Sequence, residues 1–254
     1  MSSLVLRTPQ EVLAWRKSLP VGVPVGFVPT MGALHQGHET LIQKARAENQ
    51  FVVLSIFVNP TQFNDKKDLE KYPVTWDADL AMANNNKVDI VWAPTFDLMY
   101  PDQYRFKISE NEFSQKLCGK DRPGHFDGVL TVVMKLLNVV QPTKAYFGEK
   151  DYQQLTLVKE MIESFFLPYQ IIPVPTVREV DGLAMSSRNT RLTEDQRQLA
   201  PKIYQAIKAS VSAADARAKI ESNMLEVDYV EDLKGRRYAA VRVGEVRLID
   251  NVEI

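Results

Sequence analysis

The sequence PTMGALHQGH, residues 29–38, joins two segments of different hydrophobic pattern. An apolar run over residues 23–29 predicts a buried strand, and residues 38–49 after it have helical character. Gly32 and Gly37 let the backbone approach a ligand closely. Because a helix that begins here presents unpaired N–H groups and a partial positive charge, the stretch predicts a phosphate-binding turn between strand and helix.

The alternation of strand and helix continues through residues 1–175. The pattern predicts strands at residues 23–29, 51–58, 88–93, 144–147 and 169–174, and helices at residues 8–18, 38–49, 75–87, 129–140 and 152–166. This order favours an α/β fold, a Rossmann-like parallel sheet with helices on both faces. Ligands of such sheets bind at the carboxyl ends of the strands, so we expect the loops after Pro29, Val58 and Phe147 to meet at one crevice.

The pattern changes after Pro173 and Pro175, and residues 176–254 predict a small α+β domain behind the larger domain of residues 1–175. We expect helices at residues 193–211 and 213–222, and short strands at residues 227–231, 237–243 and 246–249. Gly244 supplies the permissive backbone of a hairpin turn between the last two strands.

Composition argues against several kinds of partner. Lys plus Arg number 31 against 32 Asp plus Glu, with no long run of one sign, so we expect no nucleic acid and no membrane surface as a partner. The apolar stretches fall short of the ~18 residues that a membrane span needs, and the N-terminus lacks the pattern of a signal peptide. Cys118 is the single cysteine, so no intrachain disulfide can form, and a cytoplasmic location is expected.

His35 and His38 bracket Gly37. Both imidazoles could reach one phosphate and supply charge or a proton as a leaving group departs. A structural metal site and a helix cap without chemistry are the other interpretations. The metal interpretation is the weaker one, because His125 is the only further histidine and there is no second cysteine.

Five strings together resemble one known family. The H-x-G-H motif within residues 29–38 is similar to that of nucleotidyltransferases, and the full string is similar to the pantothenate synthetase family. Four further strings agree in order: FVNPTQF at 57–63, RPGHFDGVLTVVMKLLNVVQP at 122–142, FGEKDYQQ at 147–154 and DGLAMSSRN at 181–189, with RLIDNVEI at 247–254 as a fitting end. The chain departs from the family at Asn64, Lys67 and Val74, where Gly, an acidic residue and Arg are usual, and its C-terminal domain is shorter than usual.

The resemblance implies an ATP-dependent ligase. Pantoate attacks the α-phosphate of ATP to give pantoyl adenylate and pyrophosphate, and β-alanine then displaces AMP. It implies ATP and Mg²⁺ as cofactors, small-molecule substrates as partners, a homodimer in the cytoplasm, and a C-terminal domain that acts as a lid. Asp77 and Asp79 are either Mg²⁺ ligands or favourable charges in the first turn of a helix.

The resemblance also assigns roles to residues. The catalytic residues would be His38, His35, Lys150 and Arg188. The ATP-binding residues would be Met31, Gly32, Ala33, Leu34, His35, Gln36, Gly37, His38, Gly148, Glu149, Lys150, Asp151, Val177, Met185, Ser186, Ser187 and Arg188. Pantoate and β-alanine would contact Gln62, Gln154 and Asn59, because an amide reads a hydroxyl and a carboxylate without adding charge.

Several of these residues also have interpretations that involve no chemistry. Without their motifs, Lys150 is typical of a solvated surface lysine, Arg188 of a surface ion pair and Asp151 of a helix cap. Arg122 and His125 are expected to brace the pocket. Two other functions remain open: an H-x-G-H nucleotidyltransferase with a different acceptor, and an ATP-binding module without catalysis.

Overall fold

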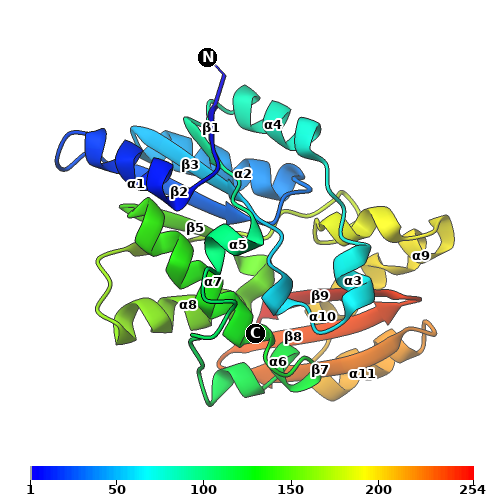
Figure 1. Cartoon of the computed structure of the whole chain (residues 1–254). Helices are drawn as coiled ribbons and strands as arrows, with labels where there is room; N and C mark the ends of the chain where they lie inside the picture. The colour runs from blue at the N-terminus through cyan, green and yellow to red at the C-terminus, as the bar shows by residue number, and fades with distance from the viewer. Residues whose placement is uncertain (1) are drawn as a thin grey trace.

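A six-stranded parallel sheet forms the centre of the larger part of the molecule (Figure 1). The computed structural model describes residues 2–254. The strands run in the order β1-β4-β3-β2-β5-β6, with bounds β1 Leu4–Leu6, β2 Val25–Thr30, β3 Phe51–Ile56, β4 Ile90–Trp92, β5 Lys144–Gly148 and β6 Gln170–Val174. The predicted α/β fold class is therefore confirmed. The edge strand β1 was not predicted, because its three residues are too few to show a pattern.

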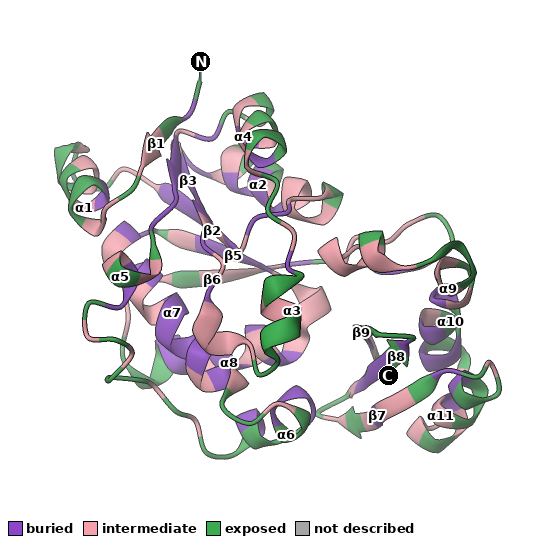
Figure 2. Ribbon diagram, turned by 45° about the vertical axis from the view of Figure 1, so that its right-hand side comes forward, coloured by how far each residue is buried: buried purple, intermediate pink, exposed green. Residues whose placement is uncertain are grey.

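Helices cover both faces of this sheet, as predicted. One core joins α1 (Pro9–Ser18), α7 (His125–Val140) and α8 (Tyr152–Ser164) to strand residues such as Phe27 and Val53. The other core joins α2 (Gln36–Glu48) and α4 (Trp76–Asn85) to the neighbouring residues on those strands, Val28 and Leu54. Successive strand residues thus point to opposite faces, and both faces are apolar because both are covered. Figure 2 shows the buried residues concentrated in these strands.

Short elements in the connections escaped prediction. They are the helices α3 (Lys66–Glu70), α5 (Phe96–Met99) and α6 (Cys118–Asp121), and the 3-10 helices η1 (Pro60–Gln62), η2 (Phe113–Gln115), η3 (Glu149–Asp151) and η4 (Ser187–Arg191). Helix α7 also begins at His125, before the predicted residue 129. Elements of one turn contain too few residues to show a hydrophobic period.

The C-terminal part is a three-stranded antiparallel sheet with helices on one side. Its elements are α9 (Glu194–Leu199), α10 (Pro201–Ala209), α11 (Ala213–Glu221), β7 (Glu226–Leu233), β8 (Arg236–Val243) and β9 (Val246–Glu253). Gly244 has φ +62° in the β8–β9 turn, as the hairpin prediction requires. The single helix expected at 193–211 is wrong: the structure has two, because Pro201 has no N–H to continue the first.

The small sheet has two different faces. Val241, Val243 and Leu248 pack with α10 and α11 in a core of their own. Tyr229, Tyr238 and Ala240 instead join the core of the larger part. No helix within residues 2–254 combines the length and the apolar character that crossing a bilayer requires.

Candidate active site

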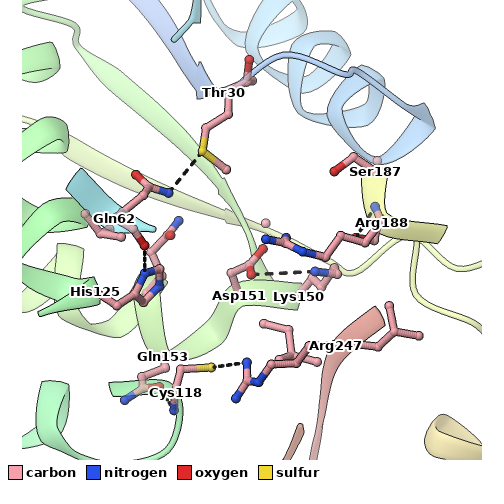
Figure 3. A pocket seen from close by; sticks show the side chains of 18 of the residues that line it. Thr30, Gln62, Cys118, His125, Lys150, Asp151, Gln153, Ser187, Arg188 and Arg247 are labelled. Carbon is pink, nitrogen blue, oxygen red and sulfur yellow. Dashed lines mark hydrogen bonds and ion pairs between the residues drawn. The ribbon is translucent and has the colours of Figure 1, made fainter. Parts of the chain in front are cut away.

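A cavity of about 730 Å³ lies between the carboxyl ends of the parallel strands and the small sheet (Figure 3). Strands β3 and β4 lie on one side of β2, and β5 and β6 lie on the other. The chain therefore reverses its direction of winding between β2 and β5, and ligands of open α/β sheets bind at such a point. The loops after β2, β3 and β5 all contribute to the cavity wall, as expected from the sequence.

The two histidines of residues 29–38 are held by the backbone of the turn itself. His35 caps α2, and its Nδ1 accepts a hydrogen bond from the Gly37 nitrogen at 3.1 Å. His38 Nδ1 accepts from the His35 nitrogen at 3.4 Å, and the two rings lie 4.1 Å apart. Because each Nδ1 accepts, the proton of each neutral ring is on Nε2. A Cβ on Gly37 would lie 2.8 Å from His35 Cε1, so any other residue here would displace the His35 ring.

Both rings are neutral near pH 7. Burial lowers the pKa of His38 to about 3, with His35 and Lys150 acting in the same direction. Burial and the charge of Lys150 lower the pKa of His35 to about 4. Before nucleotide binds, the pair therefore offers two neutral N–H donors rather than the positive charge that the sequence left open.

Asp79 of α4 braces the turn between β2 and α2. Its carboxylate accepts hydrogen bonds from the backbone nitrogens of Ala33 at 2.9 Å and Leu34 at 2.8 Å. It also accepts from Thr75 Oγ1 at 2.9 Å, and the residue is 2% exposed. Ala33 has φ +51°, a conformation that these hydrogen bonds hold in place. Asp79 is thus a structural carboxylate, and its oxygens are not free for Mg²⁺.

Residues 2–254 contain no group of three or more His, Cys, Asp or Glu side chains arranged to hold a metal ion. Asp77, the other acidic residue considered from the sequence, is exposed and lies outside the cavity wall.

Lys150 and Arg188 both line the cavity. The Lys150 side chain is 20% exposed, and its Nζ lies 3.8 Å from Asp151 Oδ1. Lys150 is close enough to the histidine pair to lower the pKa of both rings. The Arg188 nitrogen donates to Ser186 Oγ at 3.2 Å in η4, and its guanidinium pairs with Asp68 of α3 at 2.7 Å. Lys150 is therefore not a solvated surface lysine, whereas Arg188 does form an ion pair, at the cavity wall and with its side chain 25% exposed.

The predicted substrate amides Gln62, Gln154 and Asn59 all line the cavity. Asn59 is 1% exposed, and it donates from Nδ2 to Gln62 Oε1 at 3.0 Å and to the Gly128 carbonyl at 3.2 Å. Its Oδ1 accepts from Tyr100 at 3.0 Å. Asn59 therefore positions the side chain of Gln62, with its own polar atoms already engaged.

Arg122, just after α6, and His125, the first residue of α7, brace the η1 turn at Gln62, as expected. His125 Nδ1–H donates to the Gln62 carbonyl oxygen at 2.7 Å, and Arg122 Nη2 donates to it at 3.2 Å. Burial and the charge of Arg122 lower the pKa of His125 to about 3, so this ring is neutral too.

The sequence model of the pantoate-beta-alanine ligase family matches residues 4–253. The chain belongs to this family. A pantothenate synthetase of Bdellovibrio bacteriovorus is 64% identical over 250 residues, which cover 98% of this chain and 99% of that one. A pantothenate synthetase of Legionella pneumophila is 48% identical over 241 residues, covering 95% and 96%.

Solved structures of pantoate-beta-alanine ligases have the same fold. A ligase from Francisella tularensis, complexed with beta-gamma ATP and beta-alanine, matches with a TM-score of 0.94 at 41% identity, covering 99% of this chain and 98% of that one. A pantothenate synthetase from Thermus thermophilus matches with a TM-score of 0.89 at 40% identity, covering 98% and 99%.

The ligase cavity brings together most of the residues predicted to bind ATP. Its wall contains Met31, His35, Gly37, His38, Gly148, Lys150, Asp151, Val177, Met185, Ser186, Ser187 and Arg188. Five predicted residues, Gly32, Ala33, Leu34, Gln36 and Glu149, lie outside the wall. Gly32 packs against Asp79: a Cβ at position 32 would lie 2.9 Å from Asp79 Oδ2. The φ of Gly32, +79°, also favours glycine. Gly32, Ala33 and Leu34 thus shape the backbone of the turn after β2, while Glu149 lies in η3 after β5.

Other residues of this ligase site were missed. Asp68, Arg191 and Arg247 line the cavity, and Asn251 Nδ2 donates to the carbonyls of Glu149 and Lys150 at 2.9 Å. Asn251 thereby ties β9 of the small sheet to the loop after β5. No local pattern marks such residues, because their partners are distant in the sequence.

Proposed function

We propose that this chain joins (R)-pantoate to β-alanine at the expense of ATP, through a pantoyl-adenylate intermediate, releasing AMP and pyrophosphate. The observation that carries the proposal is one cavity that combines neutral imidazole donors, a lysine and paired amides at the switch point of the sheet. Membership of the pantoate-beta-alanine ligase family supports the same reaction.

In the first step, a carboxylate oxygen of pantoate attacks the α-phosphorus of ATP. The bond from that phosphorus to the oxygen bridging the α- and β-phosphates breaks, and pyrophosphate leaves with the bonding electrons. His35 and His38 donate from Nε2 to phosphate oxygens as negative charge builds, and Lys150 supplies the fixed positive charge. Donors held by the backbone need no reorganisation when the bond breaks.

In the second step, the amine of β-alanine attacks the acyl carbon. The carbon–oxygen bond to AMP breaks, AMP leaves with the bonding electrons, and the neutral amine gives up one proton to solvent as the amide forms. Gln62 and Gln154 hold the pantoyl group with uncharged amides, which leaves the acyl carbon electrophilic. The second step needs adenylation first, because a free carboxylate is a poor acyl donor.

The ATP phosphates occupy the side of the cavity formed by the turn after β2, Lys150, and Ser186 to Arg188. Asp151 accepts from the ribose hydroxyls, while Gly148 and Val177 hold the adenosine through their backbone. Mg²⁺ belongs to this proposal only as the counter-ion of the substrate ATP. Residues 1–175 form the nucleotide- and pantoate-binding domain, and residues 176–254 form a lid that closes over ATP.

Closure has a direct test. Hydrogen exchange across residues 181–189 should slow when ATP is added, because a closed lid excludes water from the backbone. Unchanged exchange with ATP binding verified separately would argue against a lid. We also propose a cytoplasmic homodimer, and light scattering at micromolar concentration that gave the mass of one 28.9 kDa chain would contradict the dimer.

The reaction itself is tested by leaving substrates out in turn. Labelled pyrophosphate should exchange into ATP with pantoate alone, and AMP should accumulate only when β-alanine is also present. Exchange that requires β-alanine would point to a one-step condensation. Exchange supported by another acid but not by pantoate would assign the chain a different acceptor.

A further inference from the structure

Arg122 is a half-buried cation without an anionic partner. Most basic side chains of the cavity wall are paired: Arg188 and Arg191 with Asp68, Arg242 and Arg247 with Asp228, Lys71 with Glu245, and Lys150 with Asp151. Within residues 2–254, the Arg122 guanidinium forms no ion pair with a carboxylate. Lys67 also lacks a partner, but it is exposed to solvent.

The contacts of Arg122 leave its charge uncompensated. Its guanidinium donates to the Gln62 carbonyl at 3.2 Å and to the neutral His125 ring at 3.5 Å. Neither acceptor carries a negative charge, and a guanidinium has five N–H donors in a planar fork that matches a carboxylate. Burial lowers the pKa of Arg122 most, and the charges of Arg188 and Arg247 act in the same direction, whereas Cys118 and Asp68 act to raise it. Such a cation gains stability when an anion enters beside it.

Arg122 makes its hydrogen bonds on the Gln62 side of the cavity, although it lies near enough to Arg188 for that charge to lower its pKa. Gln62 and His125, its two contacts, lie across the cavity from Ser187 and Arg188 (Figure 3). The reacting carboxylate of pantoate becomes an uncharged acyl group in the adenylate. The α-phosphate of the adenylate stays charged too, but the groups proposed to hold phosphate already face it. The carboxylate of β-alanine is the other anionic group of the reaction that keeps its charge, and the groups proposed to hold phosphate do not account for it.

We propose that Arg122 binds the carboxylate of β-alanine and thereby selects an amine acceptor that carries an acid. This inference rests on the proposed function. Held at its carboxylate beside Gln62, β-alanine can reach back with its amine, over two methylene groups, to the acyl carbon. The guanidinium also disfavours a second positive charge nearby, so the amine is favoured in its neutral, nucleophilic form.

The decisive experiment compares two acceptors, β-alanine and β-alaninamide, which differ in charge but have nearly the same shape. We would measure kcat/KM for each with saturating ATP and pantoate, in the wild type, Arg122→Met and Arg122→Lys. Comparing the ratio of the two values between the wild type and a variant cancels the difference in intrinsic reactivity between the two amines. Arg105→Met is the matched control, since Arg105 is exposed and lies outside the cavity wall.

The wild type should prefer β-alanine, and Arg122→Met should lower that preference about 10²-fold, the scale of losing one buried charge partner. Arg122→Lys should retain part of the preference, because it keeps the charge but not the fork. Pyrophosphate exchange with pantoate alone should fall far less than amide formation. Arg105→Met should leave the preference unchanged.

Two results would overturn the assignment. A wild type whose preference for β-alanine did not exceed the ratio of the two amines' uncatalysed reactivities toward an activated ester would have no carboxylate site. Equal losses for both acceptors in Arg122→Met would show that Arg122 only braces Gln62. Absence of pantoate-dependent exchange in the wild type would instead contradict the proposed function, so the two failures are distinguishable.

Discussion

The Arg188 guanidinium lies 2.7 Å from the carboxylate of Asp68, although 120 positions separate the two residues in the sequence. Asp68 also pairs with Arg191 at 2.8 Å. Each arginine uses one terminal nitrogen in its ion pair with Asp68, so several donors of each remain available to a phosphate. Asp68 is therefore a positioning residue that holds two cations of η4 at the cavity wall.

Substituting Asp68 should weaken ATP use without unfolding the protein. Asp68→Asn should raise the KM for ATP about tenfold in pyrophosphate exchange, the scale of a lost charge-assisted hydrogen bond, and leave the KM for pantoate near its wild-type value. Asp68→Glu should recover part of the effect. A lower KM for ATP in Asp68→Asn would mean that the carboxylate competes with the nucleotide instead of positioning its ligands.

His38→Ala should lose most of the exchange activity, ~10²–10³-fold, because it removes a donor aimed at the charge that develops on phosphate. Pantoate binding and folding should persist. His38→Gln is the matched control: its Nε2 can replace the imidazole Nε2–H, so it should keep more activity than His38→Ala. Near-normal exchange in His38→Ala would show that the residue is misassigned. His35→Ala should also be damaged, since both rings flank one site.

Gly128→Ala should impair pantoate use. A Cβ at this position of α7 would lie 2.5 Å from the Thr61 carbonyl oxygen and 2.7 Å from the Gln62 nitrogen. The backbone of η1 must therefore move, and Gln62 with it. We expect the KM for pantoate to rise about tenfold with little change in the KM for ATP, and Gly128→Ser to be worse. Equal changes in both KM values would indicate general misfolding instead.

The three histidines of the chain should make the fold sensitive to mild acid. Burial lowers the pKa of His35 to about 4, and of His38 and His125 to about 3, against 6.5 in the unfolded chain. As the pH falls below 6.5, the unfolded state binds protons that the folded state does not, so the free energy of unfolding decreases. Carboxylates contribute mainly at lower pH.

The measurement is the urea midpoint between about pH 7 and pH 5. It should fall as the pH falls, and the fall should be shallower in His125→Asn, which removes one titrating ring but can still donate to the Gln62 carbonyl. Identical slopes in the two proteins would refute the assignment of this pH dependence to His125.

Arg237→Met should destabilise the C-terminal part by about 3 kcal/mol. The Arg237 side chain is 2% exposed and forms a two-pronged ion pair with Asp232, at 2.7 and 2.9 Å. It also donates to the carbonyls of Ile207 and Ser210 at the end of α10. Urea unfolding would measure the loss, and adding Asp232→Leu should recover part of it. A stability unchanged by Arg237→Met would show that solvent replaces these contacts.

Local order was largely predictable from neighbouring residues. The strand, turn and helix of residues 25–48 follow from apolar runs, two glycines and a helix start, all within a few residues of one another. Capping by Thr8 and Glu11 at α1 was visible for the same reason, and the structure has both hydrogen bonds. Pro201 is also a local signal for the break between α9 and α10, but the helical periodicity on both sides of it favoured a single helix.

The sequence by itself determined the fold class, the family and the identity of the groups proposed to act, because hydrophobic period and ordered motifs are properties of nearby residues. Only the tertiary structure decided which charges are compensated. Asp79 proved to be a brace rather than a metal ligand, Asp68 the partner of Arg188, and Arg122 an unpaired cation. These pairings depend on elements that are distant in the sequence and that tertiary packing brings together. Burial then sets the free energy that each unpaired charge costs the folded protein.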